Sequence, residues 1–212
     1  MTFIETISKK LDNVEVVLDI GSRWGEDSLV LKNLFPAAKI YAFECTPFSI
    51  EHWKENVDDE DIILVEKAAC DFTGETKFYV NNADKTITPH PHGNQGANSL
   101  FKANHTYPYE TYIQDEIVVP CTTISDWAAE NNIKKIDVVW MDIQGAELEA
   151  LKGMGSLIKT IRAIHLEVEF RPVYLGQPLF DEIDEFLKEF GFKFVCFEHK
   201  CSWFGDANYT KL

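Results

Sequence analysis

Short runs of apolar and β-branched residues alternate along this chain with segments whose apolar positions recur every three or four residues. The first pattern predicts strands and the second predicts helices, so the alternation indicates an α/β fold whose mostly parallel sheet is covered on both faces. Strands are expected at residues 14–20, 39–43, 62–69, 76–80, 116–121, 136–141, 163–170, 192–197 and 203–209. Helices are expected at residues 3–11, 26–35, 47–56, 123–131, 146–152 and 179–189.

Residues 81–115 interrupt this alternation. They include three prolines, two glycines and three histidines, with little periodicity. A loop of this length in a compact domain is typically a functional lid or a mobile insertion. The strand at 116–121 is expected at a sheet edge, and the last two strands are expected to form a hairpin. Without a repeat or a linker, residues 1–212 are interpreted as one domain that opens with a helix within residues 1–13.

The composition agrees with one packed domain and limits the classes of molecule that it is expected to bind. Of 212 residues, 45% are hydrophobic, which is ample for a core. Lys and Arg total 20 and Asp and Glu total 35, which gives a formal net charge of -15. Such a surface disfavours nucleic acid, because neutralising phosphates supplies most of that affinity. A small or neutral substrate is therefore expected.

The cysteines and the chain's apolar runs bear on its compartment. Five cysteines are scattered without a CxxC pair, which argues against a disulfide framework and a cysteine zinc site. The first residues lack the basic-then-apolar order of a secretion signal, and no apolar run approaches the ~20 residues that cross a bilayer. A reduced, cytoplasmic protein with no membrane partner is expected, and its oligomeric state is left open.

The turn after the first strand has the spacing of a ligand loop. It reads Asp19-x-Gly21-x-x-x-Gly25, and Ser22, beside the first glycine, is a further candidate cofactor-binding residue. Ligands of open α/β sheets bind beyond the carboxyl ends of the strands, where glycine lets the backbone come close. A dinucleotide loop would read GxGxxG and hold a pyrophosphate. The missing middle glycine and the acid favour ammonium and hydroxyl groups, which S-adenosylmethionine carries without any phosphate.

Glu44 ends the second strand, nineteen residues after Gly25. A carboxylate at this place can accept hydrogen bonds from both ribose hydroxyls of an adenosyl group. Alternatively, Glu44 only caps the next helix and the glycines only make a tight turn. The combination favours an adenosyl cofactor but leaves a nicotinamide-dependent enzyme open.

A second group of polar residues follows the two most apolar late strands. Asp142 ends the strand at 136–141, near the glycine loop, where it is a candidate catalytic residue or a helix N-cap. The next strand places His165, Glu167 and Glu169 on one face by its period of two. His165 or Glu167 is a candidate general base, and Asp142, His165 and Glu167 are a candidate set for a divalent cation. The alternative for the strand residues is a set of satisfied structural hydrogen bonds.

The run from Asp142 to Gly153, DIQGAELEALKG, closely resembles the hallmark segment of the FkbM-type S-adenosylmethionine-dependent methyltransferases. Other stretches resemble that family in the same order, namely residues 17–25, 42–44, 98–100, 166–168 and 191–192. Two departures stand out. Arg23 and Trp24 are bulkier than the small or amide residues expected there, and the segment at 81–115 is rich in histidine.

The resemblance implies a Rossmann-like class I methyltransferase fold, with a seven-stranded, mostly parallel sheet whose last strand is antiparallel. It implies that Asp19, Gly21, Gly25 and Glu44 bind S-adenosylmethionine and that Asp142 lies beside the methionine end of the cofactor. It also implies methyl transfer, usually to oxygen, on sugars, polyketides or other small molecules.

We therefore expect O-methylation of a small hydroxylated acceptor, with a carbohydrate favoured. The sulfonium makes the methyl group electrophilic, so the enzyme mainly aligns the acceptor, while Asp142, Glu167 or His165 removes a proton, with or without a cation. Rival interpretations are a nicotinamide-dependent oxidoreductase and a binding domain that kept the fold without catalysis. Candidate stacking faces for a sugar are Phe101, Tyr107, Tyr109, Tyr112 and Tyr174.

Overall fold

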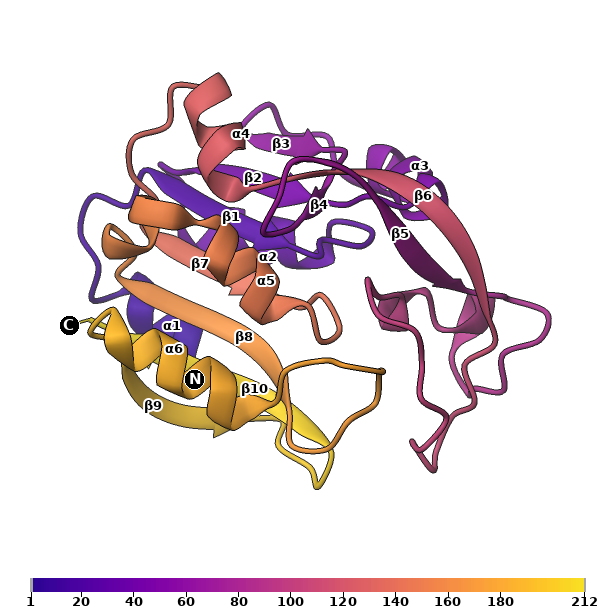
Figure 1. Cartoon of the computed structure of the whole chain (residues 1–212). Helices are drawn as coiled ribbons and strands as arrows, with labels where there is room; N and C mark the ends of the chain where they lie inside the picture. The colour runs from indigo at the N-terminus through magenta and orange to yellow at the C-terminus, as the bar shows by residue number, and fades with distance from the viewer. Residues whose placement is uncertain (1, 212) are drawn as a thin grey trace.

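The computed structural model describes residues 2–211, in which seven strands form one sheet of order β3-β2-β1-β7-β8-β10-β9 (Figure 1). Neighbours from β3 to β8 run parallel, whereas β10 pairs antiparallel with both β8 and β9. The predicted α/β sheet with an antiparallel last strand is confirmed. The strands are β1 (Val16–Ile20), β2 (Lys39–Phe43), β3 (Ile62–Val65), β7 (Val138–Met141), β8 (Ala163–Glu169), β9 (Lys193–Glu198) and β10 (Phe204–Thr210).

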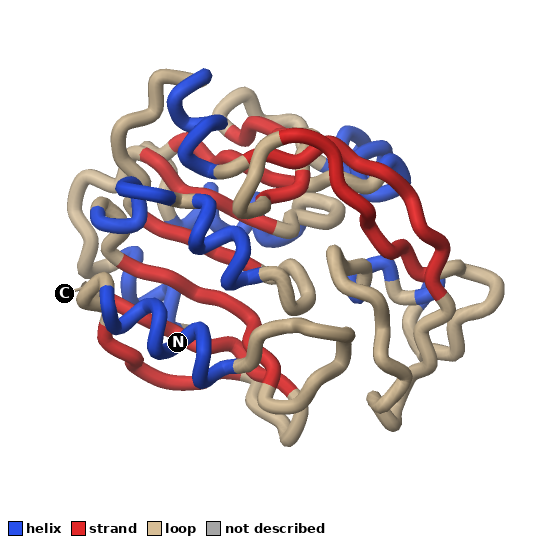
Figure 2. Tube along the Cα trace, viewed as in Figure 1, coloured by secondary structure: helices blue, strands red, loops and turns tan. Residues whose placement is uncertain are grey.

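Helices cover both faces of this sheet (Figure 2). One face carries α4 (Ile124–Glu130), α5 (Glu147–Gly153), α6 (Phe180–Glu189) and the short 3-10 helix η3 (Gly155–Lys159). The other face carries α1 (Phe3–Ser8), α2 (Glu26–Leu34) and α3 (Pro47–Asn56).

The central strands contribute side chains to the hydrophobic layers on both faces of the sheet, because successive side chains of a strand point to opposite faces. In β1, Leu18 packs with the α4–α6 side and Val17 with the α1–α3 side. In β7, Val139 and Val138 divide in the same way. The continuous apolar runs seen in the sequence therefore reflect burial on both sides.

A second sheet is the main departure from the predicted strands. Also within residues 2–211, β4 (Ala68–Ala69), β5 (Gly74–Asn81) and β6 (Gln114–Thr122) form a three-stranded sheet of order β4-β6-β5. The single strand expected at 62–69 is wrong, because β3 ends at Val65 and the Lys67 N–H turns back to the Val65 carbonyl at 2.8 Å. The edge position expected for 116–121 is also wrong, since β6 lies between β4 and β5. β4 covers only the last two residues of β6.

The segment between β5 and β6 contains two short 3-10 turns, η1 (Pro91–Gly93) and η2 (Gln95–Ala97). Figure 1 shows β5 and β6 reaching beyond the main sheet, so that this segment faces the loops after β7 and β8. Backbone hydrogen bonds join it to the loop after β8. Asn104 N donates to Val173 O at 3.0 Å, and Leu175 N donates to Lys102 O at 2.7 Å.

The predicted helices all form, with boundaries shifted by a few residues. The largest shift is in α1, which ends at Ser8 rather than at residue 11. It begins with a capping box in which Thr2 and Glu5 bond reciprocally to the backbone. Within residues 2–211, none of the helices combines the length and the apolar character needed to cross a bilayer.

Candidate active site

The turn after β1 is shaped by Gly21, whose φ is +92°. The N–H groups of Gly21 and Ser22 both donate to the Phe43 carbonyl oxygen, each at 3.0 Å. A Cβ atom added at position 21 would lie 1.9 Å from the Asp142 carbonyl oxygen. Glycine is therefore required twice, by the left-handed backbone and by the close approach of the ends of β1 and β7.

Gly25 makes a different contact. Its φ is +87°, and an added Cβ would lie 2.3 Å from Val57 Cγ2 at the end of α3. Gly25 lets the start of α2 pack against α3, and it is outside the lining of both cavities described below. Its contact with a cofactor stays a prediction.

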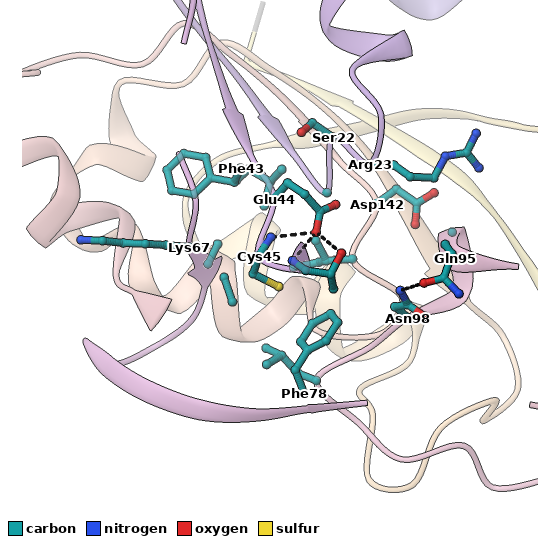
Figure 3. Close-up of a pocket in the computed structure, with 18 of the residues that line it drawn as sticks. Ser22, Arg23, Phe43, Glu44, Cys45, Lys67, Phe78, Gln95, Asn98 and Asp142 are labelled. Carbon is teal, nitrogen blue, oxygen red and sulfur yellow. Dashed lines mark hydrogen bonds between the residues drawn. The ribbon is translucent and has the colours of Figure 1, made fainter. Parts of the chain in front are cut away.

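A cavity of about 310 Å³ opens at the carboxyl ends of β1, β2 and β7 (Figure 3). Four of the residues predicted to bind the cofactor line it, namely Gly21, Ser22, Glu44 and Asp142. The Ser22 hydroxyl oxygen is buried and has no hydrogen-bond partner within residues 2–211. Much of the remaining wall is apolar and includes Ile20, Phe43, Ala68, Phe78, Leu100 and Ile143.

Glu44 lies among the lining residues shown in Figure 3. Its Oε1 atom accepts hydrogen bonds from the Cys45 N–H at 2.7 Å, the Thr46 N–H at 2.8 Å and the Thr46 hydroxyl at 2.9 Å. These bonds hold the start of α3, and all three end on one carboxylate oxygen. Burial raises the pKa of Glu44, although these bonds oppose the rise. These bonds support the capping alternative, and binding of a ribose by the same carboxyl group stays a prediction.

Asp19 lies behind the turn rather than in the cavity wall. Its Oδ2 accepts a hydrogen bond from the Ser28 hydroxyl of α2, and its Oδ1 is buried without a partner among residues 2–211. Burial raises the pKa of Asp19 to about 8, against the opposing effect of the Ser28 bond. Direct contact between Asp19 and a cofactor stays a prediction.

A second cavity of about 250 Å³ adjoins the first. Arg23, Gly96 and Asp142 line both cavities, so Asp142 lies at their junction. Glu167 lines the second cavity only. The rest of its wall comes largely from the β5–β6 segment and the loops after β7 and β8, and consists of His90, Asn94, Ala97, Tyr107, Glu110, Tyr112, Gln144, Glu169, Val173 and Phe204.

Gln144 joins the two carboxylates at this junction. Its Nε2 donates to Asp142 Oδ1 at 2.7 Å and to Glu167 Oε2 at 2.5 Å. The Tyr174 hydroxyl donates to Gln144 Oε1 at 2.8 Å, and the Ser99 hydroxyl donates to the Gln144 carbonyl at 2.7 Å. Gln144 has a φ of +56°, a left-handed conformation that is uncommon outside glycine. Contacts on both its side chain and its backbone hold it there.

Burial sets the protonation of this carboxylate pair. It raises the pKa of Asp142 to about 6. Burial, together with the nearby charge of Asp142, raises the pKa of Glu167 well above its usual range. Of the two carboxyl groups, Asp142 is therefore the more readily ionised, and Glu167 holds its proton more strongly. Asp142 is not the helix cap considered from the sequence, because α5 begins at Glu147 with Ala146 as its N-cap.

His165 lies in the interior of β8 and lines neither cavity. Its ring stacks on Trp140 with centroids 3.7 Å apart, and its Nδ1 lies 2.8 Å from Asn208 Oδ1. Burial lowers the pKa of His165. Among residues 2–211, no group of three or more His, Cys, Asp or Glu side chains is arranged to hold a metal ion. The structure thus brings Asp142 and Glu167 together without His165.

Three residues at the junction have roles that the sequence reasoning missed. Gln144 lies within the DIQGAE run, but its bridging contact depends on Glu167 from another strand. Tyr174, a candidate stacking residue, is buried and holds the Gln144 amide instead. Arg23, noted only as a bulky departure, lines both cavities and places a guanidinium nitrogen 2.7 Å from Glu26.

The 98–100 stretch that resembles the family and the candidate stacking residues are divided between the cavities and the surface. Asn98 and Leu100 line the first cavity. Tyr107 and Tyr112 line the second, whereas Tyr109 is 72% exposed.

Residues 16–194 match the family model of the methyltransferase FkbM domain. This match agrees with the α/β fold and the two adjoining cavities described above. This chain belongs to the FkbM methyltransferase family. The match spans most of the chain, including the β1 turn and both carboxylates at the cavity junction. The resemblance inferred from the sequence is confirmed.

Two curated relatives of this FkbM-family chain have named activities. The 2-O-methyltransferase NoeI of Sinorhizobium fredii is 30% identical over 164 residues, which are 76% of this chain and 66% of that protein. The hexuronic acid methyltransferase AglP of Haloferax volcanii is 22% identical over 165 residues, which are 78% of this chain and 60% of that protein. The chain therefore spans less than two thirds of the length of either relative.

The fold also resembles that of solved methyltransferases. TrmK of M. capricolum, in complex with S-adenosylhomocysteine, has a TM-score of 0.53 at 12% identity, covering 100% of this chain and 69% of that one. At this identity the likeness shows the shared fold alone.

Proposed function

We propose that this chain is an S-adenosylmethionine-dependent O-methyltransferase that acts on a hydroxyl group of a small molecule. The observation that carries the proposal is the junction at Asp142, where the cavity under the β1 turn meets the cavity that contains Glu167. Methyl transfer requires a donor and an acceptor to meet in line at one point. The first cavity would hold the donor and the second would hold the acceptor.

The residues of the first cavity fit an adenosyl cofactor. A volume of about 310 Å³ is in the range of small-molecule sites. The unpartnered Ser22 hydroxyl and the Glu44 carboxylate would bind polar groups of the cofactor. The carboxyl groups of Glu44 and Asp142, and that of Asp19 behind the turn, suit ammonium and hydroxyl groups better than a pyrophosphate.

The residues of the second cavity would orient the acceptor and take up its proton. When bound, the cofactor supplies an electrophilic methyl group. The acceptor oxygen would form the new C–O bond as the S–CH3 bond breaks, and the hydroxyl proton would pass to the Asp142–Glu167 pair. Gln144 would keep both carboxylates turned toward the same point, because its amide donates to each of them.

A carbohydrate is the acceptor class that we propose. The rings of Tyr107, Tyr112 and Phe204 lie in the wall of the second cavity together with several carboxylates and amides. Such a mixture suits a sugar, whose C–H faces pack on aromatic rings while its hydroxyls form hydrogen bonds. The names of two relatives, a 2-O-methyltransferase and a hexuronic acid methyltransferase, support this class.

Methyl transfer from labelled S-adenosylmethionine to a panel of sugars tests the proposal. Glu167→Gln should slow turnover with little change in affinity for S-adenosylhomocysteine, because Glu167 lines only the acceptor cavity. Asp142→Asn should lower both, because Asp142 lines both cavities. Glu185→Gln, at an exposed position of α6, is the control. Full turnover by Glu167→Gln would move the proton acceptor to Asp142 alone.

A further inference from the structure

The wall of the second cavity is dominated by carboxyl groups. Four acidic side chains line it, namely Glu110, Asp142, Glu167 and Glu169. The basic side chains in the same wall are His90 and Arg23. The guanidinium of Arg23 already lies 2.7 Å from Glu26 and 4.6 Å from the centroid of the Trp24 ring. The wall therefore carries more acid than base.

Three of these acids have hydrogen-bond partners within the protein. Glu110 accepts from the Thr88 hydroxyl at 2.5 Å and from the Asn94 amide at 2.8 Å. Asp142 and Glu167 accept from the Gln144 amide. The fold itself thus accounts for where these three carboxyl groups point.

Glu169 is different. It ends β8 and is only 2% exposed, yet its Oε2 atom has no hydrogen-bond partner among residues 2–211. The amide nitrogen of Gln177 is likewise without a partner that meets hydrogen-bond geometry. Burial raises the pKa of Glu169 to about 8, against the opposing effect of Gln177. A buried carboxyl oxygen without a partner is costly, so a ligand group that donates to it gains that interaction.

We infer that the acceptor is a hydroxylated amine, such as an amino sugar, whose ammonium group binds at Glu169 in the acidic wall of the second cavity. This inference rests on the proposed function and specifies the substrate class of the same site. A neutral sugar can donate hydrogen bonds to the wall, but an ammonium group also favours the ionised form of Glu169, whose pKa burial otherwise raises. A uronic acid or a phosphorylated sugar would add a further negative charge beside the four carboxyl groups. This preference is opposite in charge to the hexuronic acid in the name of the relative AglP.

Calorimetry on protein saturated with S-adenosylhomocysteine tests the inference. The probes are the amino, neutral and uronic acid forms of glucose, galactose and mannose. For at least one sugar series, the amino form should bind at least about tenfold more tightly than the neutral form, and the uronic acid should bind more weakly than both. Tighter binding of neutral or acidic forms, or binding by no member of the panel, would overturn the inference.

Variants assign the preference to Glu169. Glu169→Gln should reduce the amino-to-neutral ratio to within about twofold while leaving the affinity for S-adenosylhomocysteine unchanged, because Glu169 lies outside the first cavity. Glu185→Gln removes a charge from an exposed position of α6 and should keep the ratio. Loss of the ratio in Glu185→Gln, or its retention in a folded Glu169→Gln protein, would overturn the assignment. Failure of the wild-type protein to bind S-adenosylhomocysteine would instead remove the proposed function.

Discussion

Replacing Glu44 with glutamine separates the structural role of this residue from its proposed role in binding the cofactor. The carboxylate oxygen Oε1 holds the start of α3 through three hydrogen bonds from Cys45 and Thr46. A glutamine carbonyl can accept the same three bonds. Its amide group cannot accept hydrogen bonds from ribose hydroxyls, and the negative charge is lost.

The expected loss follows from these contacts. Hydrogen bonds to a charged group are worth about 1.5–3 kcal/mol, so the dissociation constant for S-adenosylhomocysteine should rise about 10- to 150-fold. The free energy of unfolding should change by less than about 1 kcal/mol, because the bonds to α3 persist and a carboxyl whose pKa is raised by burial is removed. Glu44→Ala should lose both the affinity and part of the stability.

Isothermal titration calorimetry and thermal unfolding measure the two effects. Glu66→Gln is a matched control, because Glu66 follows the neighbouring strand β3 but is exposed and pairs with Lys54. It should leave the affinity unchanged. An affinity of Glu44→Gln within about twofold of wild type, in protein with an unchanged melting temperature, would refute the cofactor role and leave Glu44 as a helix cap.

Three further predictions concern the turn and the carboxylate pair. Gly21→Ala should lower the free energy of unfolding by about 3 kcal/mol or more, because the new Cβ would meet the Asp142 carbonyl. The control Gly176→Ala has a similar φ of +80° but no neighbouring atoms, so it should lower that free energy by only about 1–2 kcal/mol. Equal losses in urea unfolding would contradict the clash. Burial raises the pKa of Asp142 to about 6, and a general base must be ionised to accept a proton. The methyl-transfer rate should therefore fall about tenfold per pH unit below about pH 6. A rate that stays constant below that pH would exclude the Asp142–Glu167 pair as the proton acceptor. Removal of divalent cations with EDTA should leave the rate unchanged, because the Gln144 amide already bridges Asp142 and Glu167; a loss restored by one cation would show that a metal takes part.

Much of the fold could be predicted because its strands are buried on both faces. Runs such as residues 14–20 and 136–141 are apolar at most positions, which is typical of parallel strands that are covered on both faces. Periodicity does not reveal which sheet a strand joins. Residues 62–69 look like one strand, yet the turn at Lys67 sends Ala68 into the second sheet. Likewise, the pairing of β5 with β6 across a gap of more than thirty residues is a long-range contact that leaves no local signal.

Site residues could be predicted from the sequence where a carboxylate directly follows a strand. Glu44 and Asp142 come directly after strands, and the carboxyl ends of parallel strands share one edge of the sheet, so both line the same cavity. Alternation along β8 correctly set its polar residues apart from Leu166 and Val168, which pack in the core. It could not show that His165 lies too far back along the strand to reach either cavity.

The remaining parts depend on contacts between distant segments. Gln144 bridges two carboxylates only because its backbone is left-handed and Tyr174, thirty residues later, fixes its amide. Glu169 becomes a candidate ligand-binding group only when burial leaves one of its oxygens without a partner. Neither the bridge made by Gln144 nor the unpartnered oxygen of Glu169 can be predicted from residue spacing in the sequence.

The most direct measurement of the central claim is a calorimetric titration of the folded protein with S-adenosylhomocysteine and, separately, with NAD. The cavity under the β1 turn, with Ser22, Glu44 and Asp142 in its wall, predicts saturable one-to-one binding of S-adenosylhomocysteine and no binding of NAD. Binding of NAD without S-adenosylhomocysteine would identify a nicotinamide site, and binding of neither would contradict the assignment of this cavity to a cofactor.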